Sequence, residues 1–329
     1  MTQLSILLTH QHRLISIAAV LDVFESVNNF YKLRQQAPFF DIQLVCLDTP
    51  ENDHTIYGYH PRCITTVHET DLVLIPAFST ADLQQAIAAN QGFLPWLRQQ
   101  YQQGAEIGSF CTGAFLLAAS GLLNNKKATT HIMSSEEFAK AFPEVLLYED
   151  KVITIDHGIY TSGGATNSFH LLLFLLEKYC GREIAVQTAK MFSIDMDRES
   201  QSHFSSFLPP KNHQDNLVIE AQQLIESKYH QANTVEEIIV NMPSSRRNFV
   251  RRFKHATGIT PIVYLQRTRI EAARKLLEQT NQSVTEVMLN AGYNDIKAFR
   301  TLFRKNLGLS PREYREKFNK RSVASKLGV

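Results

Sequence analysis

One cysteine of this chain lies in a setting where it could act as a nucleophile. Cys111 stands between the small residues Ser109 and Gly113, where a short apolar stretch ends and a helical stretch begins. This spacing is typical of a nucleophile elbow, a sharp turn from strand to helix with the reactive side chain at its corner. The positive end of the helix dipole would lower the pKa of the thiol and favour a thiolate able to attack an electrophile. The alternative is a small buried residue that fits a tight turn.

A nucleophilic thiol needs a base or an orienting group, and His131 follows Cys111 by 20 residues. His131 could equally be a histidine of a core or of a binding pocket without a catalytic role. We therefore name no catalytic residue and treat Cys111, Thr112 and His131 as candidate pocket residues. His10 and His12, at the end of the first apolar stretch, are weaker candidates for the same pocket, and a loop position without a function describes them at least as well.

The elements that would position these side chains alternate between short apolar stretches and helical ones. Strands are expected at residues 4–9, 42–47 and 71–76, with helices at 17–30 and 81–89 between them. Such alternation favours an α/β fold of the flavodoxin-like kind, with a mostly parallel sheet.

Composition limits the class of protein. The chain has 329 residues, of which 44% are hydrophobic and 20% are charged, so disordered, collagen-like and coiled-coil classes are excluded. No stretch reaches the roughly 18 consecutive apolar residues of a membrane span, and the N-terminus resembles no signal peptide. The four cysteines are scattered and lack metal-binding spacing. We expect a cytoplasmic protein that starts as mature chain, with no membrane association, metal or cofactor.

The formal net charge of +2 hides two halves of opposite sign. Residues 1–210 carry 13 Lys and Arg against 21 Asp and Glu, a net of −8, whereas residues 211–329 carry 21 against 11, a net of +10. The change falls beside Pro209 and Pro210, in a polar stretch that is typical of a linker. A basic domain is the electrostatic signature of a nucleic-acid binder, although a solvated helical surface could have the same charge.

The basic half contains an internal repeat with an offset of 50 residues. Residues 253–264 resemble residues 303–314, and Phe249 corresponds to Phe299. Upstream, each copy has a capping-box pattern, at 234–237 and at 283–286, followed by a turn at 241–244 or 290–293. Each copy is therefore expected to be a helix-turn-helix motif.

The second helix of each motif has a polar face opposite its two phenylalanines. A recognition helix in the major groove would direct such a face at base edges and phosphates. The expected DNA-contacting residues are Arg247, Arg251 and Lys254 in the first motif and Lys297, Thr301 and Arg304 in the second. Arg246, Arg252, Arg300 and Lys305 flank these faces and are candidates for phosphate contacts.

A helix over residues 262–279 should separate the two motifs, with Arg267 and Arg269 on its polar side. It would act as a rigid spacer that holds the two recognition helices about one turn of DNA apart, about 34 Å. The two helices could then enter successive major grooves.

Residues 217–319 resemble the AraC-type DNA-binding domain. The resemblance rests on the long pattern that runs from Gly292 to Arg315 and includes Asp295, Phe299, Phe303, Gly308, Pro311 and Tyr314. In that family an arginine commonly stands at the position of Thr301. The resemblance therefore implies double-stranded DNA as a partner, with weaker or different recognition by the second motif.

Residues 1–190 resemble the PfpI-like branch of the class I glutamine amidotransferase superfamily, best over 108–121 and 128–131. Active members place an acidic residue against the cysteine, and here the aligned position is Ser16. Active proteases of the family also tend to have a histidine after the cysteine, where this chain has Thr112. Both departures count against catalysis.

Together the two resemblances match the GlxA-type regulators of the AraC family. They imply a homodimeric transcription regulator with a PfpI-like ligand-sensing or dimerisation domain at 1–195, a linker at 196–216, a DNA-binding domain at 217–319 and a flexible tail at 320–329. The effector, a small molecule, stays unidentified. The alternatives are a Cys111-dependent hydrolase or hydratase with an attached DNA-binding domain, and an N-terminal domain that serves dimerisation alone.

Overall fold

The computed structural model divides the chain into two compact units, Met1–Gln201 and Ser202–Val329. It describes residues 1–48, 55–196, 198, 200–204, 207, 209, 213–231, 234–238, 240 and 242–319. The boundary falls inside the expected linker, and the expected tail at 320–329 lies outside the described residues, as does Asn241 of the first expected turn. Residues 202–210 carry no Lys, Arg, Asp or Glu, so the N-terminal unit has the net charge of −8 and the C-terminal unit that of +10.

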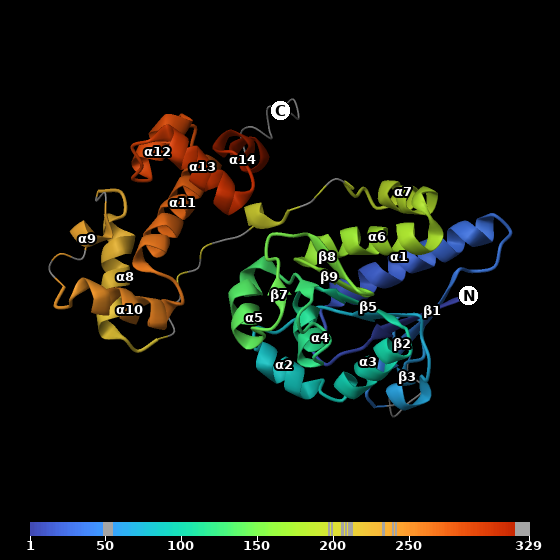
Figure 1. Cartoon of the computed structure of the whole chain (residues 1–329). Coiled ribbons are helices and arrows are strands. Elements are labelled where there is room, and N and C mark those ends of the chain that lie inside the picture. Colours follow the sequence, from blue (N-terminus) through green and yellow to red (C-terminus); the bar gives the residue numbers. More distant parts are fainter. Residues whose placement is uncertain are drawn as a thin grey trace. The chain divides into compact units, whose positions relative to one another are not determined.

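A seven-stranded sheet forms the centre of the N-terminal unit (Figure 1). Its order is β3-β2-β1-β4-β5-β9-β8, and every neighbouring pair is parallel except β8 with β9. The strands are β1 (Thr2–Leu7), β2 (Phe40–Cys46), β3 (Arg62–Cys63), β4 (Leu72–Ile75), β5 (Glu106–Phe110), β8 (Ile153–Asp156) and β9 (Ile159–Ser162). A separate two-stranded sheet pairs β6 (Lys127–Ala128) with β7 (Leu146–Leu147).

Helices cover both faces of the large sheet, as β-α-β connections require. On one face pack α1 (Leu14–Leu33), α6 (Ser168–Cys180) and α7 (Arg182–Met191), around a core that includes Phe24, Phe110 and Leu172. On the other pack α2 (Leu83–Ala89), α3 (Phe93–Gln102), α4 (Ala114–Ala119) and α5 (Ser135–Ala141), around Phe115 and Phe138. The α/β fold with a mostly parallel sheet is confirmed. The expected strands are present with shifted ends, because apolar composition marks burial and not the last ladder hydrogen bond.

The C-terminal unit is entirely helical in its described residues. Its helices are α8 (Asn216–Lys228), α9 (Val235–Ile238), α10 (Arg246–Thr257), α11 (Pro261–Gln279), α12 (Val284–Asn290), α13 (Ile296–Leu307) and α14 (Pro311–Phe318). They enclose two separate cores. The first contains Tyr264 and Leu265 from the beginning of α11, and the second contains Ile270, Ala273 and Leu277 from its remainder. Helix α11 thus connects the two helix-turn-helix motifs, α9–α10 and α12–α13 (Figure 1).

The repeat in the sequence is also a repeat of contacts. The rings of Phe253 and Tyr264 meet edge to face with centroids 5.3 Å apart, and those of Phe303 and Tyr314 meet in the same way at 5.6 Å. Helices α10 and α13 each end at a glycine in the left-handed region, Gly258 (φ 80°) and Gly308 (φ 71°). Of the expected capping boxes, that of Ser283 and Glu286 is complete. In the first motif the Thr234 hydroxyl accepts the N–H of Glu237 at 3.2 Å.

One expectation for α11 was wrong. Arg269 does not lie on a polar face: it is 7% exposed, and its Nε donates to the Tyr229 carbonyl at 2.8 Å. Its guanidinium lies over the ring of Tyr293. A helical wheel based on α11 alone cannot show that the end of α8 and the turn after α12 pack against this side.

Candidate nucleic-acid interface and thiol pocket

Helix α10 exposes a basic face. Its N-cap is Ser245, whose hydroxyl accepts the N–H of Asn248 at 3.4 Å, and Phe249 and Phe253 bury the opposite side. Arg247, Arg251 and Lys254 are all exposed, and Arg251 donates to the Asn248 side-chain oxygen at 3.1 Å. The helix contains no acidic residue. It therefore offers cations and one amide to a ligand outside the domain.

Helix α13 repeats this arrangement. The Asp295 carboxylate caps it by accepting the N–H groups of Lys297 and Ala298 at 2.7 and 3.0 Å. Lys297, Thr301 and Arg304 are exposed opposite the buried Phe299 and Phe303. The hydroxyl of Thr301 stands at the place that Arg251 occupies in the first motif, so this face has one cation fewer.

The four flanking cations differ in their surroundings. Arg252 is half-buried and forms a two-pronged contact with Asp215, at 2.6 and 2.9 Å, which ties α10 to the start of α8. Arg246 pairs with Glu236 at 2.8 Å but stays 80% exposed. Arg300 and Lys305 are exposed on α13. Arg252 therefore has a structural partner, and sequence spacing alone did not reveal Asp215, 37 residues earlier.

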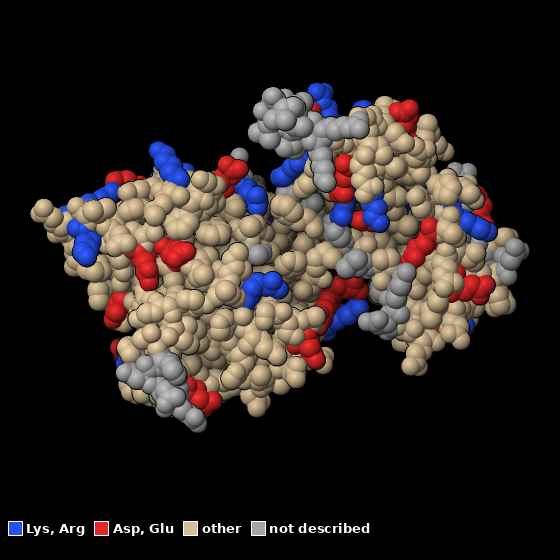
Figure 2. All heavy atoms as spheres, turned by 180° about the vertical axis from the view of Figure 1, so that it is seen from behind, with Lys and Arg blue, Asp and Glu red and all other residues tan. Residues whose placement is uncertain are grey.

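The opposite net charges of the two units do not produce surfaces of a single sign. On the face seen in Figure 2, blue and red side chains are interspersed over each unit. Helices α10 and α13 together carry nine Lys and Arg residues and no Asp or Glu, so most of the net positive charge of the C-terminal unit comes from these two helices.

The elbow at Cys111 has the backbone geometry that its sequence predicts. Cys111 follows β5 with a φ of 55°, in the left-handed region that non-glycine residues rarely adopt, and starts a 3-10 turn that continues into α4. A Cβ on Gly113 would come within 2.5 Å of the Pro76 carbonyl oxygen, so the turn requires a glycine there. The carboxyl end of β5 and the start of α4 fix the position of Cys111.

The expected thiolate was wrong. Cys111 is 3% exposed, and burial raises the pKa of its thiol above the ordinary value. The Thr112 N–H and the Arg13 charge act in the opposite direction and offset only part of that rise. Desolvation of a charged sulfur outweighs the dipole of a short helix, so the thiol stays protonated at neutral pH.

The ring of His131 is oriented by a neighbouring backbone group. The N–H of Met133 donates to Nδ1 at 3.1 Å, which leaves the proton of the neutral imidazole on Nε2. Burial lowers the pKa of His131, and the Arg13 charge lowers it further. The Cδ2–Nε2 edge faces Gly164, where a Cβ would lie 3.5 Å from Nε2. His131 therefore presents a neutral N–H donor at pH 7.

The loop after β4 joins the elbow to the start of α1. The Thr112 hydroxyl accepts the N–H of Phe78 at 2.9 Å, and the Ser16 hydroxyl accepts that of Ala77 at 3.3 Å. Both hydroxyls serve backbone donors, and both residues are buried. Arg13, which sequence reasoning missed, donates its own N–H to the Ala77 carbonyl at 2.7 Å. Of the candidates Cys111, Thr112 and His131, only His131 is partly exposed.

His10 and His12 lie in the loop after β1 and make local contacts. The N–H of His10 donates to the Asn90 side chain at 2.8 Å, and the His12 ring contacts the Thr9 carbonyl at 2.7 Å. Among the described residues, neither ring forms a hydrogen bond with Cys111 or His131, and the loop interpretation accounts for both.

Comparison with known families assigns both halves. Residues 63–178 match the DJ-1/PfpI family, and residues 241–317 match a helix-turn-helix domain. The chain joins a DJ-1/PfpI domain to an AraC-type helix-turn-helix domain. The two resemblances drawn from the sequence are thereby confirmed.

Two relatives that match about two thirds or more of this chain are named as transcriptional regulators. The HTH-type transcriptional regulator GbdR of Pseudomonas aeruginosa is 30% identical over 225 residues, which cover 67% of this chain and 60% of that protein. The HTH-type transcriptional regulator CdhR of the same organism is 28% identical over 240 residues, 72% of this chain and 71% of that one. The match therefore spans about three fifths of the length of GbdR.

The fold also resembles a solved structure, a transcriptional regulator protein from Vibrio parahaemolyticus. The TM-score is 0.50 at 21% identity, covering 58% of this chain and 98% of that one. At this identity the likeness concerns the fold alone.

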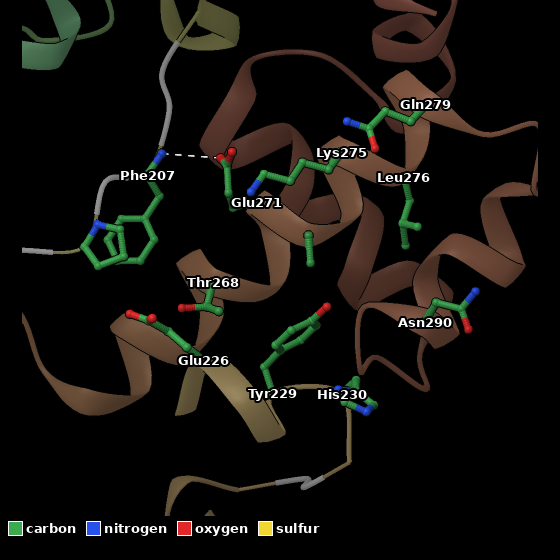
Figure 3. A pocket seen from close by; sticks show the side chains of 12 residues that line it. Phe207, Glu226, Tyr229, His230, Thr268, Glu271, Lys275, Leu276, Gln279 and Asn290 are labelled. Carbon is green, nitrogen blue, oxygen red and sulfur yellow. Dashed lines mark hydrogen bonds between the residues drawn. The ribbon is translucent and has the colours of Figure 1, made fainter. Parts of the chain in front are cut away.

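A cavity of about 580 Å³ lies in the AraC-type domain, along α11. Figure 3 shows its lining, with Glu226, Tyr229 and His230 in the lower part of the view, the α11 residues Thr268, Glu271 and Lys275 above them, and Phe207 at the upper left. None of the candidate DNA-contacting residues lines it.

The described residues contain no cluster of three or more His, Cys, Asp or Glu arranged to hold a metal ion. Over the same residues, no helix combines the length and the apolar character that crossing a membrane requires.

Proposed function

We propose that this protein is a sequence-specific, DNA-binding transcription regulator whose DNA affinity is set by a small molecule bound in the DJ-1/PfpI domain. The observation that carries the proposal is the pair of helices α10 and α13, each with an exposed face free of carboxylates and a buried aromatic side. The regulatory names of GbdR and CdhR support it.

In this proposal α10 and α13 enter successive major grooves. Arg251 is suited to base edges, since it projects from the middle of the exposed face and is oriented by Asn248. Arg247, Lys254, Lys297 and Arg304 supply further base or phosphate contacts, and Thr301 a weaker one. Arg246, Arg300 and Lys305 would meet phosphates. Arg252 would contribute mainly by holding α10 against Asp215.

The charges around the elbow favour an effector with an acidic group. The Cys111 thiol and the His131 imidazole are both uncharged at neutral pH, because burial shifts both pKa values toward the neutral form. Arg13, whose charge acts on both groups, is then the cation of the site. A carboxylate or phosphate could pair with Arg13 and accept the His131 Nε2–H.

DNA binding is tested by selecting duplexes from a random library with the full chain and measuring the affinity of the selected duplex at several salt concentrations. We expect a steep loss of affinity with salt, because each neutralised phosphate releases counterions. A failure to enrich any sequence, with no footprint at any salt concentration, would refute the proposal.

Effector binding and assembly have separate tests. We expect an acidic metabolite to raise the unfolding temperature of the wild-type chain and to have a much smaller effect on Arg13→Ala. If no metabolite of a broad panel shifts it, the N-terminal domain serves dimerisation alone. We further propose a homodimer, which sedimentation equilibrium would establish or exclude.

A cysteine-dependent hydrolase or hydratase is the second candidate, favoured by the left-handed backbone at Cys111. The buried, protonated thiol, the Ser16 hydroxyl in place of a carboxylate and the Nδ1 of His131 engaged with Met133 all argue against it. Rapid alkylation of Cys111 at neutral pH, with turnover abolished in Cys111→Ala, would restore this candidate.

A further inference from the structure

The last residue of the N-terminal unit, Gln201, is buried in that unit. It is 1% exposed, although it lies in the stretch expected to be a linker. Its N–H donates to the Asp150 carbonyl at 2.9 Å, and Ser200 forms an antiparallel bridge with Lys151. The start of the linker is therefore attached to the loop before β8.

The side-chain amide of Gln201 is fully used. Its Nε2 donates to backbone carbonyls and to one hydroxyl: Glu149 O at 2.9 Å, Thr130 O at 3.0 Å and Thr129 Oγ1 at 3.3 Å. Its Oε1 accepts from the Gly164 N–H at 3.0 Å and from Asn167 Nδ2 at 3.1 Å. A buried amide with donors and acceptor all satisfied is held in one orientation.

The partners of this amide lie beside Cys111 and His131. The Thr130 hydroxyl donates to the Cys111 carbonyl at 2.9 Å, and His131 is the next residue. Gly164, on the other side, packs against the His131 ring. Gln201 thus connects the strand-turn-helix after β9 to the segment that carries His131.

Gly163 shows how closely the amide fits. A Cβ on Gly163 would lie 2.1 Å from the Gln201 Oε1, well inside van der Waals contact. The φ of Gly163 is not in the left-handed region, so its backbone would accept an alanine. A glycine is required at position 163 because of the Gln201 side chain and not because of the backbone conformation.

Phe207, six residues after Gln201 in the same expected linker, packs against the C-terminal unit. The Phe207 ring meets Tyr264 edge to face at 5.2 Å, its N–H donates to Glu271 at 3.3 Å, and Arg267 lies over it at 5.9 Å (Figure 3). Tyr264 belongs to the core behind recognition helix α10. Each end of this linker segment is therefore bound by the unit that it adjoins.

We propose that Gln201 is a latch that couples the proposed effector site around Cys111 and His131 to the linker, and through it to DNA affinity. A ligand that shifts residues 130–131 or 163–164 moves the donors and acceptors of the amide, which releases or tightens the beginning of the linker. This inference rests on the proposed function, because it assigns the regulation of that same site. Gln201 is a positioning residue: it contacts the pocket segments and not the ligand.

The test uses two single variants of the full chain and their combination. Gln201→Ala removes the amide, and Gly163→Ala expels it by a clash. In both we expect hydrogen exchange at residues 200–202 to accelerate about tenfold or more. The double variant should match Gln201→Ala alone, because without the amide the alanine at 163 has room. Gln84→Ala, at an exposed position of α2, is the matched control and should change nothing.

Exchange does not require DNA, so this arm stands even if the proposed function fails. Unchanged exchange in both single variants, or full additivity in the double variant, would overturn the latch. If Gln201→Ala does not fold, Gly163→Ala and its rescue by a second-site Gln201→Ser carry the same test.

The second arm measures affinity for the duplex selected from the random library. We expect both single variants to change Kd in the same direction by about fivefold or more, the lower range of allosteric coupling. A Kd equal to that of wild type, with accelerated exchange, would show that Gln201 only attaches the linker and would overturn the coupling. Failure to select any duplex would refute the proposed function and leave the exchange result to decide the latch.

Discussion

The guanidinium of Arg269 lies 5.4 Å from the centre of the Tyr293 ring, which places a buried cation of α11 against the turn of the second helix-turn-helix motif. The same side chain donates to the carbonyl of Tyr229, at the end of α8, a helix that shares its core with α10 of the first motif. Burial lowers the pKa of Arg269 without making it neutral at any physiological pH. One residue of α11 thereby joins the turn of the second motif to α8, the helix that packs with the first motif.

Arg269→Ala should destabilise the C-terminal unit by about 2–4 kcal/mol, because it removes a charge-assisted hydrogen bond and a cation–π contact and leaves a buried carbonyl without its donor. Urea unfolding followed by circular dichroism measures the change. Arg312→Ala is the matched control: Arg312 is 86% exposed and pairs with Glu316 within α14, so its loss should be small. Equal effects of the two changes would contradict the assigned role.

Arg251→Ala should weaken binding to the selected duplex by about 1–3 kcal/mol. If Arg251 contacts a base edge, selectivity at one base pair is lost, and if it meets a phosphate, all sequences weaken alike. Competition assays with every single-base variant of the duplex distinguish the two results. No loss on any duplex would place α10 outside the interface.

Thr301→Arg should strengthen binding and steepen its salt dependence, since it adds a cation at the position equivalent to Arg251. The slope of log K against log salt should rise in magnitude by about 0.9 if the new side chain meets one phosphate. Gln84→Arg adds the same charge on α2 of the N-terminal unit. A similar gain in that control would attribute the effect to net charge alone.

Arg252→Ala should lower stability but leave the salt slope of DNA binding unchanged, because Arg252 is engaged by Asp215. Arg252 lowers the pKa of the Asp215 carboxyl, so the ion pair stabilises the folded state above the ordinary carboxyl pKa of about 3.9. This contribution is lost as pH falls through the lowered folded pKa. Urea unfolding at pH 7 and at low pH should show a difference between variant and wild type that disappears in acid.

His131 should titrate below its ordinary pKa of 6.5 in the folded chain. Between the folded pKa and 6.5 the unfolded chain binds more protons, so the N-terminal unit should lose stability as pH falls from about 6.5. The side-chain NMR resonances of His131 report the titration directly. In His131→Gln this part of the pH dependence should be absent, while the part due to His170, whose pKa burial also lowers, should persist. A midpoint above 6.5 would contradict the burial argument.

Residues close together in the sequence were sufficient to predict the elbow at Cys111 and the two helical motifs. The small residues on either side of Cys111 predicted the elbow, and the close approach of the Pro76 carbonyl to Gly113 is the physical reason for one of them. The aromatic residues that recur at a constant offset predicted two equivalent helical motifs. In each motif the phenylalanine packs against a tyrosine at the corresponding position of the next helix, Tyr264 in α11 or Tyr314 in α14. Such features depend on residues that lie close together in the chain.

Contacts between distant segments could not be predicted in this way. The thiolate expected at Cys111 was wrong because burial by other elements outweighs the helix dipole. The exposed position expected for Arg269 was wrong because two other segments cover it. Gln201 gives no local signal, since its side-chain partners lie 34 to 72 residues away.

Because the C-terminal unit has two separate aromatic cores, the exposed faces of α10 and α13 can change independently of each other. Helix α10 packs on the core of Phe253 and Tyr264, and α13 packs on the core of Phe303 and Tyr314. A substitution at the exposed position 251 or 301 therefore leaves the core of the other motif untouched. If α10 and α13 each bind one half-site, as proposed, the sequence preference of one half-site can change in a single step while the other still binds the protein to DNA. Thr301, where the first motif has an arginine, is a position at which the two copies have already diverged.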